Sequence, residues 1–422
     1  MSIFISIAAY RDPELIPTIE DCLRRARYPA DLRFGICWQH GEGEPPPPRL
    51  DGGRMRVIDV PWRESRGACW ARAEVMKLWD GEEHFLQLDS HHRFAEDWDS
   101  VLLDQMERSG SAKPVLTTYA AGYDPAAPTP GAASATRMKF DRFTQEGIPL
   151  FQSCVFPGWQ AGAGPVRARF ASAHLLFAPG SFVAEIPYDP DLYFIGEEIT
   201  LAIRAFTHGY DLFHPGAHVV WHEYGRPLRP KHWDDHLPGS GIETTWHARD
   251  VASLEKVRRF LCRPHIGPYG CGRARSFGDY QTYAGVNFRR RFACRAARLG
   301  EEPPLPPSPC NPSQAGRTWT VRLALDQEKL LPEALDNPMF WYVGFHDADG
   351  VEIARHDASR GEMAGSLARD GRSIILERCF TSPRPPASWT IWPTDRRGRW
   401  LDRMGGPIAL GEDRSPLITV EC

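Results

Sequence analysis

The first 90 residues alternate short apolar runs with amphipathic stretches, which is typical of strands alternating with helices. The apolar runs have the length of buried strands. Asp12 followed by Pro13 predicts a helix start, because Asp caps helices and Pro suits their first turn. The pattern predicts strands at residues 3–8, 32–38, 55–60 and 84–88, and helices at residues 13–27 and 67–79. This order predicts a parallel sheet covered by helices on both faces.

The same mixed pattern continues to about residue 302 and then gives way to strands of period two. Six prolines fall in residues 303–312, and we expect a linker there. Residues 347–350 (Asp-Ala-Asp-Gly) predict a hairpin turn between alternating strands. The sequence therefore predicts an α/β domain over residues 1–302 and a small antiparallel β-sandwich over residues 313–422. We expect the sandwich to fold separately and to contribute no catalytic residue.

Composition and charge narrow the class of protein. The 422-residue chain has a formal net charge of −4 and a pI of about 6.4, which indicates neither a basic nucleic-acid surface nor an acidic tail. The amino terminus lacks the features of a signal peptide, and no apolar window predicts a membrane span. The ten cysteines form no Cys-x-x-Cys pair, which argues against a zinc ribbon or a secreted disulfide scaffold. We expect a cytoplasmic protein.

The end of the fourth predicted strand carries the most informative chemical signal. Asp89 and His91 follow the apolar residues 85–88, and alternation along an extended backbone places both side chains on the same side. A carboxylate and an imidazole so placed can bind one divalent cation such as Mn²⁺ or Mg²⁺. Ligands of parallel sheets gather at the carboxyl ends of strands. The alternative is an ordinary strand end with solvated polar residues.

Two other features are candidates for the same site. His222 follows the apolar residues 219–221 and is a candidate third metal ligand, with a structural histidine as the alternative. Glu197 and Glu198 stand where a loop enters a predicted helix. They would either bind substrate hydroxyl groups or complement the helix dipole.

Arginines also gather near the predicted strand ends. Arg11, Arg66 and Arg72 are the candidates. A guanidinium group binds a phosphate through two parallel hydrogen bonds, whereas a solvated surface charge is the alternative for each residue. Together with the metal ligands, these arginines indicate a ligand that carries phosphate groups.

Eight short motifs occur in the order of a known enzyme family. They lie at residues 6–14, 35–39, 67–72, 86–94, 116–119, 183–189, 194–199 and 207–211. The series resembles the polypeptide α-N-acetylglucosaminyltransferase family, whose best known member modifies hydroxyproline on the Skp1 protein. The resemblance covers about residues 1–290. Residues 224–227 (Tyr-Gly-Arg-Pro) depart from the family pattern, so the acceptor is not identified.

The resemblance implies an α/β fold of the nucleotide-diphospho-sugar transferase (GT-A) type, a UDP-N-acetylglucosamine donor, Mn²⁺ or Mg²⁺, and retention of anomeric configuration. It implies that Asp89 and His91 form an Asp-x-His metal motif, with His222 as the distant ligand. Glu198 would contact the sugar, with Glu197 as the second carboxylate to test. The candidate donor-binding residues are Ala8, Arg11, Arg66, Arg72 and Arg226. The acceptor would carry a hydroxyl group, with a polypeptide among the candidates.

Two other classes of function stay open. A metal-dependent hydrolase of nucleotide sugars or phosphodiesters would use the same ligands to activate water. A two-metal hydrolase would need more ligands near Asp89 than the sequence places there. A non-catalytic carbohydrate-binding protein would use the sandwich aromatics, although core packing is the alternative role for them. These aromatics are Trp341, Trp389, Trp392 and Trp400.

Overall fold

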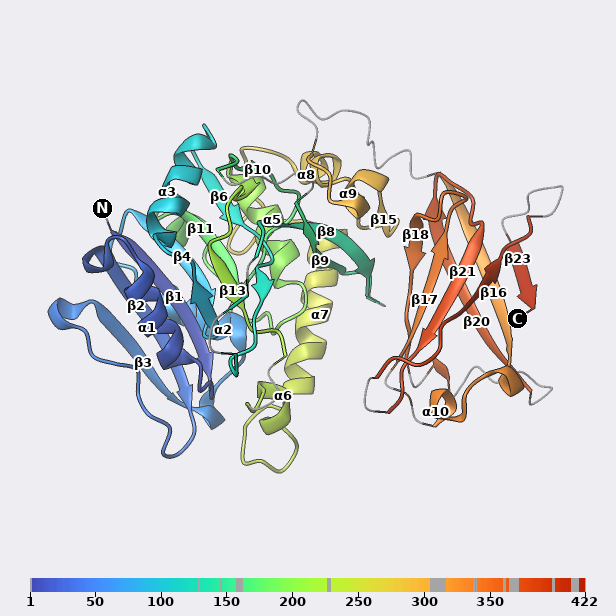
Figure 1. Ribbon diagram of the computed structural model, residues 1–422, viewed down its shortest axis with the longest axis horizontal. Coiled ribbons are helices and arrows are strands. Elements are labelled where there is room, and N and C mark those ends of the chain that lie inside the picture. The colour runs from blue at the N-terminus through green and yellow to red at the C-terminus, as the bar shows by residue number, and fades with distance from the viewer. Residues whose placement is uncertain are drawn as a thin grey trace. The chain divides into compact units, whose positions relative to one another are not determined.

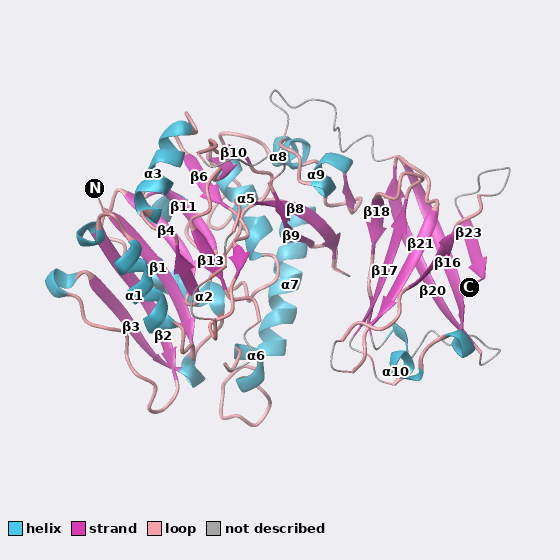
Figure 2. Cartoon of the chain, in the orientation of Figure 1, coloured by secondary structure: helices cyan, strands magenta, loops and turns pink. Residues whose placement is uncertain are grey.

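The chain forms two compact units, both drawn in Figures 1 and 2. The computed structural model describes residues 2–127, 130–131, 133–144, 146–156, 162–225, 229–303, 316–336, 338, 340–359, 362–363, 372–396, 399–410 and 417–421. The first unit comprises Met1–Lys139, Phe151–Ala284 and Gly300–Pro304. The second unit comprises Phe140–Leu150, Gly285–Leu299 and Leu305–Cys422.

An eight-stranded sheet forms the centre of the first unit. Its strand order is β10-β12-β6-β11-β4-β1-β2-β3. The bounds are Ile3–Tyr10 (β1), Leu32–His40 (β2), Met55–Pro61 (β3), His84–Asp89 (β4), Pro114–Thr117 (β6), Val166–Arg167 (β10), Leu175–Pro179 (β11) and Asp211–His214 (β12). Strands β1, β2, β3 and β4 run parallel, whereas β11 is antiparallel to β4 and β6. The predicted parallel sheet is therefore confirmed for the four strands that the pattern identified.

Helices cover both faces of this sheet. On one face, the alternating isoleucines of β1 share a core with Leu15 of α1 and Trp98 of α3. On the other face, Gly35 of β2 lies so close to Phe4 and to Val75 of α2 that any larger side chain would collide with the Phe4 ring. The helices of this unit are Leu15–Arg25 (α1), Ala68–Met76 (α2), Trp98–Arg108 (α3), Phe182–Glu185 (α4), Glu197–Thr207 (α5), His232–Asp235 (α6), Trp246–Cys262 (α7) and Phe277–Ala284 (α8). None of the described helices is both long and apolar enough to span a membrane.

A small second sheet brings distant parts of the sequence to the end of β4. It contains β5 (His92–Phe94), β13 (Val220–His222) and β7 (Ala121–Gly122). Strand β13 pairs antiparallel with β5, and the register sets His222 opposite His92. Because β5 follows β4 after a two-residue turn, this pairing carries His222 to the strand end of Asp89.

The second unit is built on two β-sheets, ordered β20-β16-β23 and β18-β17-β21-β22, with β19 beside β17. The bounds are Arg317–Asp326 (β16), Phe340–His346 (β17), Glu352–Arg355 (β18), Ala358–Ser359 (β19), Ser373–Ser382 (β20), Ser388–Pro393 (β21), Met404–Pro407 (β22) and Leu417–Glu421 (β23). Trp341 and Trp389 pack in its core, whereas Trp392 and Trp400 are exposed. The predicted antiparallel sandwich is confirmed except at β23, which pairs parallel with β16.

Two segments from earlier in the sequence belong to this second unit, namely Phe140–Leu150 and Gly285–Leu299. Asp141 in the first segment pairs with Arg355 of the sandwich at 3.0 Å. The last boundary between the units, at Pro304 and Leu305, falls inside the predicted 303–312 linker, but a single boundary does not separate the units because these two earlier segments belong to the second one. All of the linker except its first residue lies outside the described residues. The remaining elements are Thr136–Phe143 (β8), Pro149–Val155 (β9), Val286–Asn287 (β14), Phe292–Ala293 (β15), Arg295–Leu299 (α9) and Pro332–Leu335 (α10).

Candidate active site

Asp89 is the last residue of β4 and lies at the carboxyl edge of the sheet. In the parallel register, Ala8 of β1 is its backbone neighbour. Backbone pairing therefore fixes the position of Asp89 at the carboxyl end of a central strand, where side chains from several elements can reach it. The predicted donor-binding residue Ala8 lies directly beside it.

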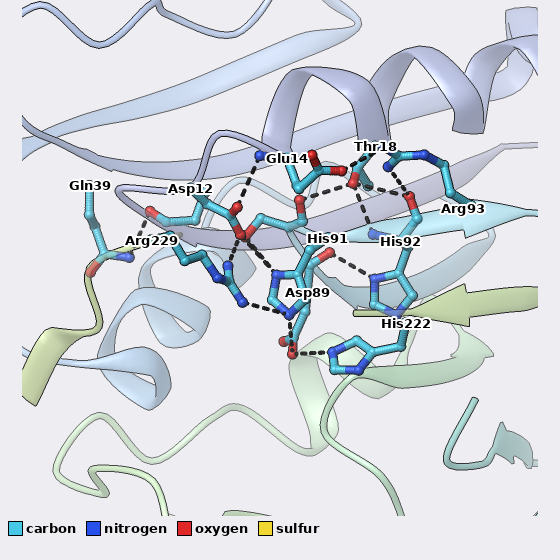
Figure 3. A network of polar contacts seen from close by, with 12 residues as sticks. Asp12, Glu14, Thr18, Gln39, Asp89, His91, His92, Arg93, His222 and Arg229 are labelled. Atoms are coloured by element: carbon cyan, nitrogen blue, oxygen red, sulfur yellow. Dashed lines mark hydrogen bonds and ion pairs between the residues drawn. The ribbon is translucent and has the colours of Figure 1, made fainter. Parts of the chain in front are cut away.

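Asp89, His91 and His222 converge at this edge (Figure 3). The Nε2 atom of His222 lies 3.2 Å from Asp89 Oδ2, and the Nε2 atom of His91 lies 3.5 Å from the same oxygen. One ligand atom from each residue lies within 4.8 Å of the other two. Both histidines are buried, whereas the Asp89 side chain is 20% exposed, so the cluster can be reached from the carboxylate side. The structure thus brings together the three residues predicted as metal ligands.

Asp12 contacts His91 at Nδ1, the ring nitrogen that faces away from Asp89. Its Oδ2 atom lies 2.8 Å from His91 Nδ1, and its side chain has no solvent exposure. Because a carboxylate only accepts hydrogen bonds, this contact keeps a proton on Nδ1 and directs the Nε2 lone pair toward the cluster. Arg229 donates one hydrogen bond to Asp12 and another, over 3.0 Å, to His91 Nε2. A cationic group therefore stands at the nitrogen that would bind a metal.

Arg72 sets the charge state of Asp89. Its Nη2 atom donates to Asp89 Oδ1 over 2.6 Å, and its side chain is almost fully buried. Burial alone would raise the pKa of Asp89, but the hydrogen bond with His222 and the charge of Arg72 outweigh it and hold that pKa well below its usual range. Asp89 is therefore an anion at neutral pH, with one oxygen on Arg72 and the other toward the two histidines.

Two further histidines lie behind His222. The ring of His174 stacks on His222 with 4.3 Å between centroids, and the ring of His92 lies 4.9 Å away. Burial, followed by the proximity of His222, lowers the pKa of both His92 and His174 well below the usual value. Both rings are therefore neutral at pH 7, and they add no positive charge that would oppose a bound cation.

Glu198 lies in the first turn of α5. Gly196 at the helix entry has a φ of +97°, and a Cβ there would lie 2.7 Å from Val257, so the entry requires glycine. Glu198 accepts hydrogen bonds from the Ala173 backbone N–H over 2.9 Å and from the Tyr119 hydroxyl. Burial raises the pKa of Glu198 to about 7, although both hydrogen bonds act to lower it. This carboxyl group therefore changes its charge near neutral pH.

Glu197 has different surroundings from its neighbour on α5. It accepts a hydrogen bond from the Cys69 thiol over 3.0 Å, and its carboxylate lies 3.9 Å from Arg72. Burial raises the pKa of Glu197, and the charge of Arg72 offsets part of that rise. Arg72 thereby lies between Asp89 and Glu197 and connects the strand end with the start of α5.

Of the other predicted donor-binding arginines, the two that the structure describes do not join this cluster. Arg11 has a φ of +45°, and its guanidinium pairs with two carboxylates at 3.2 and 2.9 Å. Arg66 is exposed on the segment that precedes α2, and Arg226 lies outside the described residues. Arg72 is thus the predicted arginine that the structure brings to Asp89, and nucleotide binding by the other three stays a prediction.

Sequence reasoning missed Asp12, Tyr119, His174 and Arg229 as parts of the site. Asp12 carried a signal only as a helix cap, and its Oδ1 atom does accept the Glu14 N–H over 3.0 Å. The other three carry no local signal, because their contacts join segments far apart in the chain. The contact between Arg229 and His91, for example, spans 138 positions.

Comparison with known families matches most of the chain. The family described as "Glycosyltransferase (GlcNAc)" matches residues 2–52 and 48–290. The chain therefore belongs to this glycosyltransferase family. The matched residues include Asp89, His91 and His222. A search of curated protein sequences found no match.

Two solved structures illustrate the range of structural similarity. GalNAc-T7, crystallised with UDP, GalNAc and Mn²⁺, has a TM-score of 0.47 and 15% identity over 62% of this chain and 48% of its own. TarS 1–349 of S. aureus has a TM-score of 0.32 and 8% identity over 53% of this chain and 60% of its own. The chain thus spans about half of the GalNAc-T7 chain and less than two thirds of the TarS chain.

The predicted fold class is confirmed by the two units. An α/β domain carries the family match, and a β-sandwich follows it in the sequence, whereas the nucleotide-diphospho-sugar transferase (GT-A) type stays a prediction. The family match supports the predicted enzyme class, glycosyltransferase.

Proposed function

We propose that this protein is a metal-dependent, retaining glycosyltransferase that moves N-acetylglucosamine from UDP-N-acetylglucosamine to a hydroxyl-bearing acceptor. The observation that carries the proposal is the convergence of Asp89, His91 and His222 within a chain of a glycosyltransferase family. The description of the family supports N-acetylglucosamine as the sugar. Retention of configuration follows from the resemblance of the eight sequence motifs.

The donor atoms of this cluster suit Mn²⁺ better than Mg²⁺, because Mg²⁺ prefers oxygen ligands alone. One carboxylate oxygen and two imidazole nitrogens form a mixed set that Mn²⁺ accepts readily, with the remaining positions left for phosphate oxygens and water. When bound, the metal would supply the positive charge that stabilises the leaving diphosphate.

The surrounding residues prepare these ligands. Asp12 orients the imidazole of His91, and Arg72 fixes Asp89 as an anion. A buried carboxylate beside a ligating histidine typically raises metal affinity, because it holds the ring in the binding orientation. Arg229 has to leave His91 Nε2 before that nitrogen can bind a metal, so metal binding and the position of Arg229 are linked.

Glu198 is the carboxylate that we assign to the sugar. Its two oxygens are held by Tyr119 and by the Ala173 backbone, so its orientation is fixed before substrate binds. As a carboxylate it would accept hydrogen bonds from sugar hydroxyl groups and stabilise positive charge that develops at the anomeric carbon. Glu197 is committed to Cys69 and lies near Arg72, which makes it the less suitable of the two.

The acceptor and the compartment belong to the same proposal. We expect a hydroxyl group on a polypeptide as the acceptor, in line with the family that the motifs resemble. The eight described cysteines are all free thiols, which is typical of the reducing cytoplasm.

The donor is tested by measuring UDP release from UDP-GlcNAc, UDP-GalNAc, UDP-glucose and UDP-galactose, each with Mn²⁺ and with EDTA. We expect UDP-GlcNAc to be the best donor and EDTA to abolish release. Faster release from another sugar would overturn the assignment of the donor. Release that persists in EDTA would overturn the metal, and NMR of a transferred product with inverted anomeric configuration would overturn retention.

A further inference from the structure

A large cavity lies in the first unit on the side of α2 and α5 that faces α7, away from the metal cluster. Its volume is about 1170 Å³. Residues of α2, α5, α7 and the loop that precedes α5 line it, and Asp89, His91 and His222 are absent from the described lining. Arg204, two turns after Glu197 on α5, lines its floor. Seven helical residues rise by roughly 10 Å, so this floor is well separated from the catalytic end of the helix.

Basic residues dominate the lining of this cavity. Seven basic and three acidic residues line it, namely Arg66, Arg204, Arg249, Lys256, Arg258, Arg259 and Arg263 against Glu74, Asp189 and Asp191. Lys256 takes up two of the carboxylates, because its Nζ lies 2.7 Å from Asp189 and 2.8 Å from Asp191. Among the described residues, no carboxylate accepts a hydrogen bond from the guanidinium of Arg66, Arg204 or Arg249. The cavity therefore carries positive charge that the protein does not neutralise.

Arg204 is the residue that most needs a partner. It is only 4% exposed, and its buried Nε–H donates to no described atom. Its guanidinium lies 5.7 Å from the ring of Tyr269. Burial lowers the pKa of Arg204 to about 10, partly offset by nearby Asp189, so the side chain is a cation at neutral pH. A buried cation without a hydrogen-bonded anion destabilises the folded state, and an anionic ligand would relieve that cost.

Aromatic side chains give the cavity flat apolar surface in addition to its positive charge. Trp70, Tyr193, Phe260 and Tyr269 line it. The guanidinium of Arg66 lies 5.9 Å from the Trp70 ring, and the buried Nε of Arg249 also has no described acceptor. Guanidinium groups bind oxyanions through paired hydrogen bonds, and aromatic walls bind planar or apolar bodies.

We propose that this cavity is a second ligand site, for a small molecule or chain end that carries a phosphate or carboxylate group on an aromatic or apolar body. The oxyanion would bind Arg204, with Arg249 nearer the opening. The proposal does not depend on the proposed transferase activity, because it rests on charge, burial and volume in a region outside the metal cluster.

Calorimetric titration of the full-length protein tests the site, in EDTA and without UDP-sugar so that the metal cluster is not engaged. The probes are phenyl phosphate, inorganic phosphate and benzoate. We expect phenyl phosphate to bind more tightly than inorganic phosphate, because only the former reaches the aromatic walls. Stronger binding of benzoate than of phenyl phosphate would identify a carboxylate as the physiological group.

The variant Arg204→Met tests whether the probes bind in this cavity or elsewhere on the protein surface. Methionine keeps much of the side-chain volume and removes the buried charge, so we expect a folded protein with a melting temperature at least as high as that of the wild type. We expect its affinity for phenyl phosphate to fall about tenfold or more, since a charge-assisted hydrogen bond is lost. Arg108→Met is the control, because Arg108 does not line the cavity, is 40% exposed and pairs with Asp104 at 3.2 Å. Equal affinity in wild type and Arg204→Met, or no binding of any probe at about 10 mM, would overturn the proposal.

If Arg204→Met does not fold, Arg249→Gln provides the second test. Arg249 is partly exposed, and its charge adds to that of Arg66. We expect at least a threefold loss of affinity for phenyl phosphate, and an unchanged affinity would count against the site.

Discussion

The carboxyl group of Glu198 provides a test of the electrostatics of the site. Its burial raises the pKa to about 7 from an ordinary value of 4.5, so the folded protein binds a proton there more tightly than the unfolded chain does. For such an acid, folding is favoured by protonation. The free energy of unfolding should therefore decrease as pH rises from about 4.5 through 7. Glu198→Gln removes this dependence, because glutamine does not titrate.

The magnitude follows from the difference between the two pKa values. Integration of proton linkage between pH 5 and pH 8 gives about 2.5 kcal/mol, at about 1.4 kcal/mol per pKa unit. The residue is partly exposed, so solvent screening makes this value an upper estimate. We expect the free energy of unfolding of Glu198→Gln, measured relative to that of the wild type, to increase by up to about 2.5 kcal/mol from pH 5 to pH 8.

The measurement is urea-induced unfolding of both proteins at pH 5, 6, 7 and 8. Glu96→Gln is the matched control, since Glu96 is 70% exposed and lies outside the cluster. A wild-type-minus-variant difference that is constant with pH would refute the assigned burial of Glu198. The same variant should lose transfer much more than UDP affinity, and equal loss of both would indicate a structural role at the start of α5.

Four further predictions concern the metal cluster and the second unit. Asp89→Ala should abolish metal-dependent UDP-sugar turnover while the far-UV circular dichroism spectrum is unchanged; wild-type turnover without added metal would show the metal assignment to be wrong. Asp12→Asn should raise the Mn²⁺ concentration for half-maximal activity by about 10–100-fold, and an unchanged requirement would show that Asp12 does not orient His91. In a metal-bound crystal structure, His222 Nε2 should lie about 2.0–2.2 Å from the ion, and a separation beyond about 3 Å would exclude it as a ligand. A chain that ends at residue 304 should still hydrolyse UDP-GlcNAc slowly but melt at a lower temperature, because Phe140–Leu150 and Gly285–Leu299 lose their packing partners. A folded truncated chain that binds no UDP-sugar would mean that the second unit completes the active site.

Local patterns predict the strand end of the site but not the contacts that surround it. The apolar run predicts that Asp89 ends a strand, and the two-residue spacing predicts that His91 lies close to it, although His91 lies in the turn after β4. His222 needs the pairing of β13 with β5, which the sequence pattern does not specify. Asp12 illustrates the limit: it was predicted as the helix cap, but the N-cap of α1 is Glu14, and the contact of Asp12 with His91 depends on packing between distant segments.

The fold shows the same division between local and distant information. The first four strands and α1 follow from periodicity and helix caps, and each is observed within a few residues of its predicted bounds. The composition of the second unit does not follow from the proline-rich segment. Contacts such as the ion pair between Asp141 and Arg355 make the earlier segment Phe140–Leu150 part of this unit. Arg11 was expected at a phosphate, and its pairing with Glu44 and Asp235 likewise depends on residues far away in the sequence.

The central claim is that Asp89, His91 and His222 hold a metal that N-acetylglucosamine transfer requires. The most direct test is the initial rate of UDP release from UDP-GlcNAc during a Mn²⁺ titration of wild type, Asp89→Asn and Asp59→Asn. Asp59 is 68% exposed and pairs with His40 on the neighbouring strand, so it controls for the loss of a carboxylate. We expect saturable activation by Mn²⁺ in wild type and Asp59→Asn, and no activation in Asp89→Asn. Saturable activation of Asp89→Asn with the wild-type Mn²⁺ requirement would contradict the claim.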